Sequence, residues 1–195
     1  IPKLIIHAFK NFYYSEYFKA YSYNRFYFNL PSLASIFATS FKVGDIIEYG
    51  SGDRLIPIQS IYKFFSGGSG SLRGWSAKGN GVLANKLNGG KFILEGSLEL
   101  RKKLFPSKDN FLKNISGAFF LDYGNVWESH KDFKFNQIAL AIGFGVRYNL
   151  FIGPIRVDFG FKLYDPLDQD KWLFNNFSRI FKDKFAIQFG IGEAF

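Results

Sequence analysis

The chain has 195 residues, a net charge of +9 and no cysteine, and 21% of its residues are Phe, Tyr or Trp. This length suits one domain with a sizeable core. The lack of cysteine excludes a disulfide-stabilised scaffold and a thiolate metal site. No window approaches the roughly 18 consecutive apolar residues of a membrane-spanning helix. The sequence begins with neither a signal peptide nor a methionine, so we do not expect Ile1 to be a natural start.

The excess of basic residues is compatible with a nucleic-acid or anionic membrane partner. These residues are scattered, however, and the densest group, 101–103, is short. We therefore interpret them as a solvated face and expect no nucleic-acid partner. The two histidines, His7 and His130, lie far apart without a metal-ligand motif, and no nucleophile elbow is present. The sequence thus predicts no catalytic residue, no metal and no cofactor, and the protein is not expected to be an enzyme.

The first third of the chain contains four segments compatible with strands but without a distinctive signature. Their expected boundaries are uncertain by about 2–4 residues. The segments are Lys3–Tyr13, Tyr17–Asn29, Phe37–Glu48 and Leu55–Phe65.

The next feature is the glycine-rich stretch FFSGGSGSLRGW, residues 64–75. Glycine-rich loops often bind phosphate, because their backbone N–H groups approach anions closely. The spacing of Gly68, Gly70 and Gly74 is one residue longer than the dinucleotide fingerprint, and no Gly-Lys-Ser/Thr follows. The residues after Trp75 also contain glycines where a helix would need good helix formers. We therefore exclude a nucleotide site and interpret the stretch as an irregular loop.

Five later segments alternate between bulky apolar residues and small or polar residues. In the last of them, most odd positions are Phe or Ile, whereas the even positions are Ala, Gln or Gly. Period-two alternation is typical of strands, whose successive side chains point to opposite faces. The predicted strands are Lys91–Lys103, Ile115–Trp127, Ile138–Asn149, Gly153–Tyr164 and Phe185–Phe195.

The distribution of bulky residues favours an all-β transmembrane antiparallel β-barrel. One face of each strand is apolar and bulky, while the other carries glycine, small or charged residues, the reverse of a soluble sandwich. A tilted strand needs about 9–11 residues to cross a bilayer, and spanning strands must close into a barrel. Aromatic residues at strand ends fit the interfacial girdles of such barrels. A soluble β-barrel is the alternative.

Five motifs in a fixed order carry a family resemblance. They are GGSGSLRGW, EGSLELR, FFLDYGNVW, GPIRVDFGFKLYDP and FGIGEAF, and they extend from Gly67 to Phe195. Together they resemble the Omp85 outer-membrane proteins. Trp75 stands where the family more often has Phe or Tyr. The resemblance implies that residues 1–195 form the C-terminal portion, about nine strands, of a roughly sixteen-stranded barrel in the bacterial outer membrane. The periplasmic POTRA repeats of the family are not in this chain.

The resemblance also implies a role for the glycine-rich loop, about residues 66–90. In the family this loop folds into the barrel, and its arginine meets acidic residues on the inner wall. Matched by position, the latch residues are Arg73, Gly74, Glu99 and Asp122. Strand parity supports this independently, because both carboxylates fall on the polar faces of their strands. An exposed loop arginine is the alternative. Tight turning of the loop would use its glycines, Gly67, Gly68 and Gly70.

The orientation follows from the C-terminus, which lies on the periplasmic side in bacterial barrels. Counting strands backward puts Leu55–Phe65 in an ascending strand and residues 66–90 outside. It puts the turns NLFIGP and YGSGDR on the periplasmic side. The expected nine strands cannot close the barrel alone, so another chain or a further region supplies the rest.

The function implied by the resemblance is mechanical. Insertase members fold client outer-membrane proteins through a weak seam between their first and last strands. The seam strand here would be 185–195, with Phe185, Phe189, Gly190, Gly192 and Phe195 as its site residues. The two glycines either weaken its packing or provide space inside the barrel. The expected partners are outer-membrane lipids, client proteins and periplasmic or lipoprotein accessory subunits.

Two classes of function remain open from the sequence. The first is an assembly factor of the BamA or TamA kind, with a preference for the TamA-like branch and a Bacteroidetes-like source. The second is a transport barrel, either a two-partner secretion pore of the same family or an unrelated porin. A porin is expected to lack the arginine loop.

Overall fold

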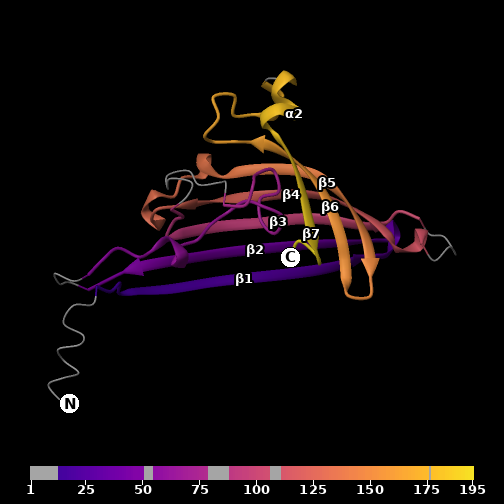
Figure 1. The fold of residues 1–195 in the computed structure, drawn as a ribbon. Coiled ribbons are helices and arrows are strands. Elements are labelled where there is room, and N and C mark those ends of the chain that lie inside the picture. The colour runs from indigo at the N-terminus through magenta and orange to yellow at the C-terminus, as the bar shows by residue number, and fades with distance from the viewer. Residues whose placement is uncertain (1–12, 51–54, 79–87, 106–110, 176) are drawn as a thin grey trace, which may run out of the picture.

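The structure, a computed structural model, describes residues 13–50, 55–78, 88–105, 111–175 and 177–195. These residues form one antiparallel sheet in which each strand pairs with its neighbours in the chain. The sheet curves strongly, so that it has a concave and a convex face (Figure 1). Its strands are β1 (Tyr17–Leu30), β2 (Ser35–Glu48), β3 (Phe92–Lys103), β4 (Ile115–Trp127), β5 (Ala139–Leu150), β6 (Gly153–Tyr164) and β7 (Phe185–Ile191).

Helical structure in the described residues is confined to short turns in the connections. None of these helices is long and apolar enough to span a membrane. The only α-helix described is α2 (Ile180–Asp183), and the others are 3-10 turns. They are η2 (Pro31–Leu33), η3 (Ser60–Tyr62), η4 (Leu112–Asn114), η5 (His130–Asp132), η6 (Phe135–Gln137), η7 (Leu173–Asn175) and η8 (Phe177–Arg179). The predicted all-β antiparallel fold is therefore confirmed.

The predicted alternation appears in the burial of the strands. In β3, Ile93, Glu95, Ser97 and Glu99 are buried on the concave face, while the intervening residues are more exposed. The register pairs Ser97 with Asp122 in β4, and residues paired across antiparallel strands share one face. The polar side chains of these neighbouring strands therefore gather on the concave face.

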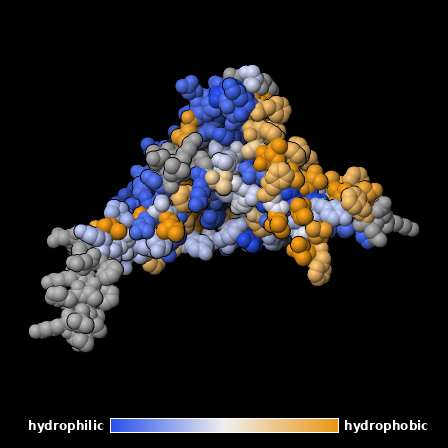
Figure 2. Space-filling model, in the orientation of Figure 1, coloured by the Kyte–Doolittle hydropathy of each residue, from blue (hydrophilic) through white to orange (hydrophobic). Residues whose placement is uncertain are grey.

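The convex face carries the bulky residues of the alternation. Phe144 of β5 and Phe159 of β6 are register partners, and their rings stack with centroids 5.1 Å apart. Phe185 of β7 continues this row, 6.3 Å from Phe159. Apolar residues gather where β5, β6 and β7 lie, whereas the region around α2 is hydrophilic (Figure 2). In a transmembrane barrel, an apolar band of this kind faces lipid and the polar region beyond it faces water.

The predicted strand Leu55–Phe65 is wrong. Leu55 and Phe64 make only isolated bridges, to Tyr14 and Gly90, and η3 lies between them. Because β2 pairs directly with β3, residues 49–91 form a single connection at one end of the sheet. The stretch YGSGDR, predicted as a turn at the opposite end, belongs to this connection, and its residues 51–54 lie outside the described residues. The predicted strand Lys3–Tyr13 lies almost wholly outside them.

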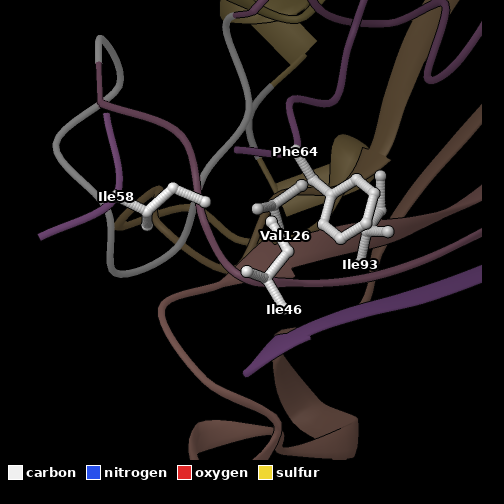
Figure 3. Close-up of a cluster of buried hydrophobic side chains, with 5 residues drawn as sticks. All are labelled: Ile46, Ile58, Phe64, Ile93 and Val126. Carbon is white, nitrogen blue, oxygen red and sulfur yellow. The ribbon is translucent and has the colours of Figure 1, made fainter. Parts of the chain in front are cut away.

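The stem of this β2–β3 loop packs on the concave face of the sheet. Ile58 and Phe64 of the loop join three strand residues in a buried apolar cluster, completed by Ile46, Ile93 and Val126 (Figure 3). Two backbone hydrogen bonds between Phe64 and Gly90, 2.8 and 2.9 Å long, tie the two arms of the loop together. Burial of a Phe or Ile side chain contributes about 1.5–3 kcal/mol, so this cluster anchors the loop inside the curve of the sheet.

The last strand is shorter than predicted. β7 pairs with β6 from Phe185 to Ile191, and the chain then leaves the sheet. Gly192 has a φ of +84°, a left-handed conformation that glycine adopts readily and other residues avoid. The C-terminal tail, residues 192–195, therefore turns away from the strand direction, and the C-terminus appears in front of the middle of the sheet (Figure 1).

Candidate functional site

The candidate site is built around Arg73, at the inner end of the β2–β3 loop. Leu72 and Trp75 flank the arginine and pack on Ala139 and Ala141 of β5 in a second buried apolar cluster. These contacts press the loop onto the concave face. Arg73 itself is 0% exposed, which is unusual for an arginine and demands charged or polar partners.

Those partners are two carboxylates on adjacent strands. The Arg73 Nε atom donates to Asp122 Oδ2 at 2.8 Å, and Nη2 donates to Asp122 Oδ1 at 2.7 Å. The Nη1 atom donates to Glu99 Oε2, also at 2.7 Å. The backbone N–H of Arg73 adds a further bond to Asp122 Oδ2 at 3.1 Å. Such charge-assisted, two-pronged contacts are among the strongest hydrogen bonds in proteins.

Two neutral side chains complete the immediate surroundings of the guanidinium. Ser97 accepts a hydrogen bond from Arg73 Nη2 at 3.1 Å and donates one to Asp122 Oδ1 at 2.6 Å. The ring of Phe120 lies beneath the guanidinium, 3.4 Å from its central carbon to the ring centroid. A stacked arginine and aromatic ring attract one another through the negative face of the ring. The guanidinium of Arg73 is therefore held at its edges by Asp122, Glu99 and Ser97, and one of its faces packs on Phe120.

A second group of charged side chains surrounds this contact, and no motif in the sequence predicted it. Glu99 Oε1 accepts from Arg147 Nη2 at 2.8 Å and from Arg101 Nε at 2.6 Å. Asp158 of β6 pairs with Arg156 and lies 3.7 Å from Arg73 Nη1. The alternation in β5 and β6 predicts that Arg147, Arg156 and Asp158 point to the concave face. No sequence motif predicts which carboxylate each arginine contacts.

The cluster as a whole is close to charge balance. The charged side chains are four arginines and four carboxylates, namely Arg73, Arg101, Arg147, Arg156, Glu99, Asp122, Asp158 and Glu193. All except Arg101, Arg156 and Glu193 are at most 1% exposed. Three buried side-chain atoms in the described residues have no hydrogen-bond partner: Arg101 Nη2, Arg147 Nη1 and Asp158 Oδ1. The described residues contain no group of three or more His, Cys, Asp or Glu arranged for a metal. The arrangement fixes one segment of the chain against another.

Glycines allow the loop backbone to lie directly on the strands. A Cβ added at Gly160 of β6 would collide with the carbonyl of Arg73, and one at Gly74 would lie 3.2 Å from Ala141 and Lys162. Gly67 and Gly68 have φ angles of +93° and +95°, which turn the chain before the arginine. A Cβ at Gly70 would meet only the carbonyl of Ala194, at 3.7 Å.

The predicted seam residues fall into two groups. Phe185 and Phe189 lie on the convex side of β7, and Gly190 lies on the concave side, where an added Cβ would be 2.8 Å from the Arg156 guanidinium. Gly192 and Phe195 lie beyond the strand.

The tail containing Phe195 crosses the concave face. Glu193 accepts from Arg147 Nε at 3.1 Å, and Tyr27 of β1 donates its hydroxyl to the Phe195 carbonyl at 3.1 Å. The Phe195 ring is 8% exposed and lies 5.1 Å from the Arg101 guanidinium. Phe195 is thus an interior residue here and not part of an outward aromatic girdle.

The fold is similar to that of a solved outer-membrane protein. The crystal structure of BamA from Haemophilus ducreyi lacking POTRA domains 1-3 superposes with a TM-score of 0.65 at 17% sequence identity. The match covers 89% of this chain and 34% of that chain, so the sheet corresponds to about a third of the BamA structure. At this level of identity the likeness shows a shared fold. The model of the Omp85 superfamily domain matches residues 8–195, nearly the whole chain, and the protein therefore belongs to the Omp85 superfamily.

Proposed function

We propose that the complete protein is an outer-membrane assembly factor that inserts client β-barrel proteins through a seam at β7. Membership in the Omp85 superfamily points to the bacterial outer membrane and to insertion or translocation of proteins, a class of work without enzymatic chemistry. The observation that carries the narrower proposal is the short pairing of β7 with β6, over residues 185–191 only, while the buried Arg73 contact, which holds a long loop inside the curved sheet, argues against a passive porin. A passive porin has no need of a loop fixed by two carboxylates on the wall.

The geometry of the latch residues supports a role for them in controlling the seam. Arg73 is positioned by Asp122 and Glu99, while Gly74 brings the backbone within contact distance of β5 and β6. A loop held in this way narrows the interior and braces β3, β4 and β6 against one another. Its release would change the shape of the interior and the freedom of the neighbouring strands at the same time. We therefore assign the four latch residues to control of the seam.

The seam strand supplies the second part of the proposal. β6 has 12 residues, but β7 pairs with it over only seven before the chain departs at Gly192. In a closed barrel, the other edge of β7 would meet the barrel's first strand. A last strand held by so short a ladder on the β6 side could part from that first strand and serve as a template for β-augmentation, in which a client strand adds its own backbone hydrogen bonds. The C-terminus would lie on the periplasmic side, as in bacterial barrels.

The test is a covalent lock. In the full-length protein, one cysteine is placed in β7 and one in the barrel's first strand, so that a disulfide holds the seam closed. We expect the oxidised protein to stop inserting a client barrel into liposomes and the reduced protein to recover. A second disulfide between β3 and β4, away from the seam, is the matched control and should leave insertion unchanged. Full insertion by the seam-locked protein would refute the gate.

A secretion pore of the same superfamily is the alternative function. It would use the same latch but export an unfolded substrate through the interior, so a seam lock would not block transport. The client proteins, the accessory subunits and the choice between BamA-like and TamA-like branches remain predictions from the sequence. The number and type of any POTRA repeats in the full-length protein would help to separate an assembly factor from a secretion pore, as would the lock experiment.

A further inference from the structure

Arg156 of β6 joins the β2–β3 loop to the C-terminal tail. Its Nη2 atom donates to the Ser69 carbonyl in the loop at 2.7 Å, and its Nε atom donates to the Gly192 carbonyl in the tail at 3.0 Å. The Nη1 atom pairs with Asp158 on the same strand. The arginine is 3% exposed. Because a guanidinium donates in several fixed directions, one side chain can bridge two segments that belong to different ends of the sheet.

We propose that Arg156 is a positioning residue that couples the loop to the end of the seam strand, so that displacement of the loop loosens the tail. The inference deepens the proposed function, since it names what regulates the seam, and it rests on that function for its biological meaning. The coupling itself is a physical property of the described residues and can be measured separately.

The loop meets the end of the chain at further points beside Arg156. Gln188 of β7 donates from Nε2 to the Trp75 carbonyl at 2.9 Å. Gly70 lies against the Ala194 carbonyl, which a Cβ at that position would approach to 3.7 Å. The loop therefore contacts β7 directly through Gln188 and is joined to the tail through Arg156, and displacement of the loop removes these contacts together.

The carboxylates of the Arg73 contact extend the coupling to the latch. Asp158 Oδ2 pairs with Arg156 and lies 3.7 Å from Arg73 Nη1. Glu99 binds Arg73 through one oxygen and Arg147 through the other, and Arg147 in turn holds Glu193 of the tail. Removal of Arg73 would therefore disturb the partners of both arginines that hold the tail.

Gly190 leaves room for the guanidinium of Arg156 beside β7. A Cβ at Gly190 would lie 2.8 Å from the central carbon and from two nitrogens of the Arg156 guanidinium. The glycine thus serves close approach of a charged side chain, the second of the two roles expected for it from the sequence. Substitution by alanine would move the guanidinium while keeping every charge in the cluster.

The coupling is tested by hydrogen exchange in the full-length protein in lipid nanodiscs. Amide exchange of peptides covering 185–195 is measured for wild type, Arg73→Ala, Arg156→Gln and the double variant. We expect each single variant to accelerate exchange, and the double variant to fall short of the product of the two effects by at least about fivefold, the lower end of ordinary coupling between sites. Arg156→Lys should behave like Arg156→Gln, because an ammonium cannot replace the fork that reaches both carbonyls.

The controls separate coupling from loss of charge. Arg179→Gln removes an arginine that binds Asp168, Asp170 and Asp183 away from the tail. Because α2 packs on Phe185, the comparison uses exchange of residues 189–195, which should be unchanged. If the Arg156→Gln protein does not assemble, Gly190→Ala replaces it in the experiment. If the Arg73→Ala protein does not assemble, Arg73→Lys replaces it. Multiplicative effects in the double variant, or full rescue by Arg156→Lys, would overturn the inference.

Client insertion measured on the same samples keeps the two proposals apart. Coupled exchange in a wild-type protein that inserts no client would end the proposed function and leave the coupling in place. Active client insertion together with independent exchange effects of the two substitutions would end the coupling inference and leave the proposed function in place.

Discussion

The guanidinium of Arg73 and the carboxylate of Asp122 meet edge to edge, with both oxygens engaged at 2.7 and 2.8 Å. This contact crosses from an irregular loop to the middle of β4, and both side chains are at most 1% exposed. A buried pair of this kind fixes one arrangement, because every partial separation leaves a charge without its partner. Partial displacement of the loop is therefore unfavourable.

The first prediction is that Arg73 and Asp122 are energetically coupled. In a double-mutant cycle of Arg73→Ala and Asp122→Ala, we expect a coupling of about 0.5–3 kcal/mol in the free energy of unfolding. Arg73→Lys should recover only part of it, since an ammonium cannot make the two-pronged contact. Urea unfolding in lipid bilayers provides the measurement. Strict additivity of the two substitutions would contradict a direct contact.

The second prediction concerns the convex face. Phe159→Arg places a charge near the middle of a predicted lipid-facing strand and should cost roughly 2–4 kcal/mol of barrel stability. Phe151→Arg, in the exposed turn between β5 and β6, should cost about 0–1 kcal/mol, as expected near an interface. Unfolding free energies in bilayers compare the two. Equal costs would mean that the convex face of β6 does not contact hydrocarbon.

The third prediction tests the seat of the loop on β6. Gly160→Ala should destabilise the docked loop by about 1–3 kcal/mol, because the new methyl group would press on the backbone carbonyl of Arg73. Limited proteolysis of the β2–β3 loop reports the effect as faster cleavage. Gly70→Ala is the matched control, since its methyl group meets only one atom at an ordinary contact distance. Similar cleavage of both variants would show that the loop does not rest on Gly160.

The fourth prediction is a pH dependence in the loop between β6 and β7. Burial raises the pKa of Asp168. Hydrogen bonds from Arg179 and from the Asp170 backbone amide lower it by more, so the pKa lies below its usual value. A carboxylate with a lowered folded-state pKa stabilises the fold above its unfolded pKa of about 3.9. That stabilisation is lost as the pH falls through the folded-state pKa.

Protease protection of residues 165–184, measured between about pH 6 and pH 2, should therefore decline at the acid end. Asp168→Asn should remove the part of this decline that belongs to Asp168. A variant with an unchanged acid profile would show that another group controls the loop.

Much of the sheet could be predicted because the alternation of side chains along a strand depends only on neighbouring residues. Alternation alone located β3, β4, β5 and β6 to within a few residues, since side chains on a strand must point to opposite faces. It misled at Leu55–Phe65, where Ile58 and Phe64 are buried by a loop packed on the sheet and not by a ladder. Spaced apolar residues that anchor a loop give the same signal as a strand.

The contacts of Arg147 and Arg156 were beyond the sequence for a different reason. Parity places both side chains on the concave face, but their partners depend on strand register and on the curvature of the sheet. Arg156 meets Gly192 only because the tail turns inward, and that turn depends on a single φ angle. Contacts that depend on the positions of several strands have no signature in the local sequence.

The contact of Tyr27 with the carbonyl of Phe195 spans 168 positions of the chain. A contact of such sequence separation cannot form early, because the entropy of closing the intervening chain must be offset first, and non-local topologies fold slowly. The tail also lies beside the loop at Gly70, so we expect the tail to settle after the sheet and the loop are in place. Formation of the Tyr27–Phe195 contact would then be a late marker of correct folding.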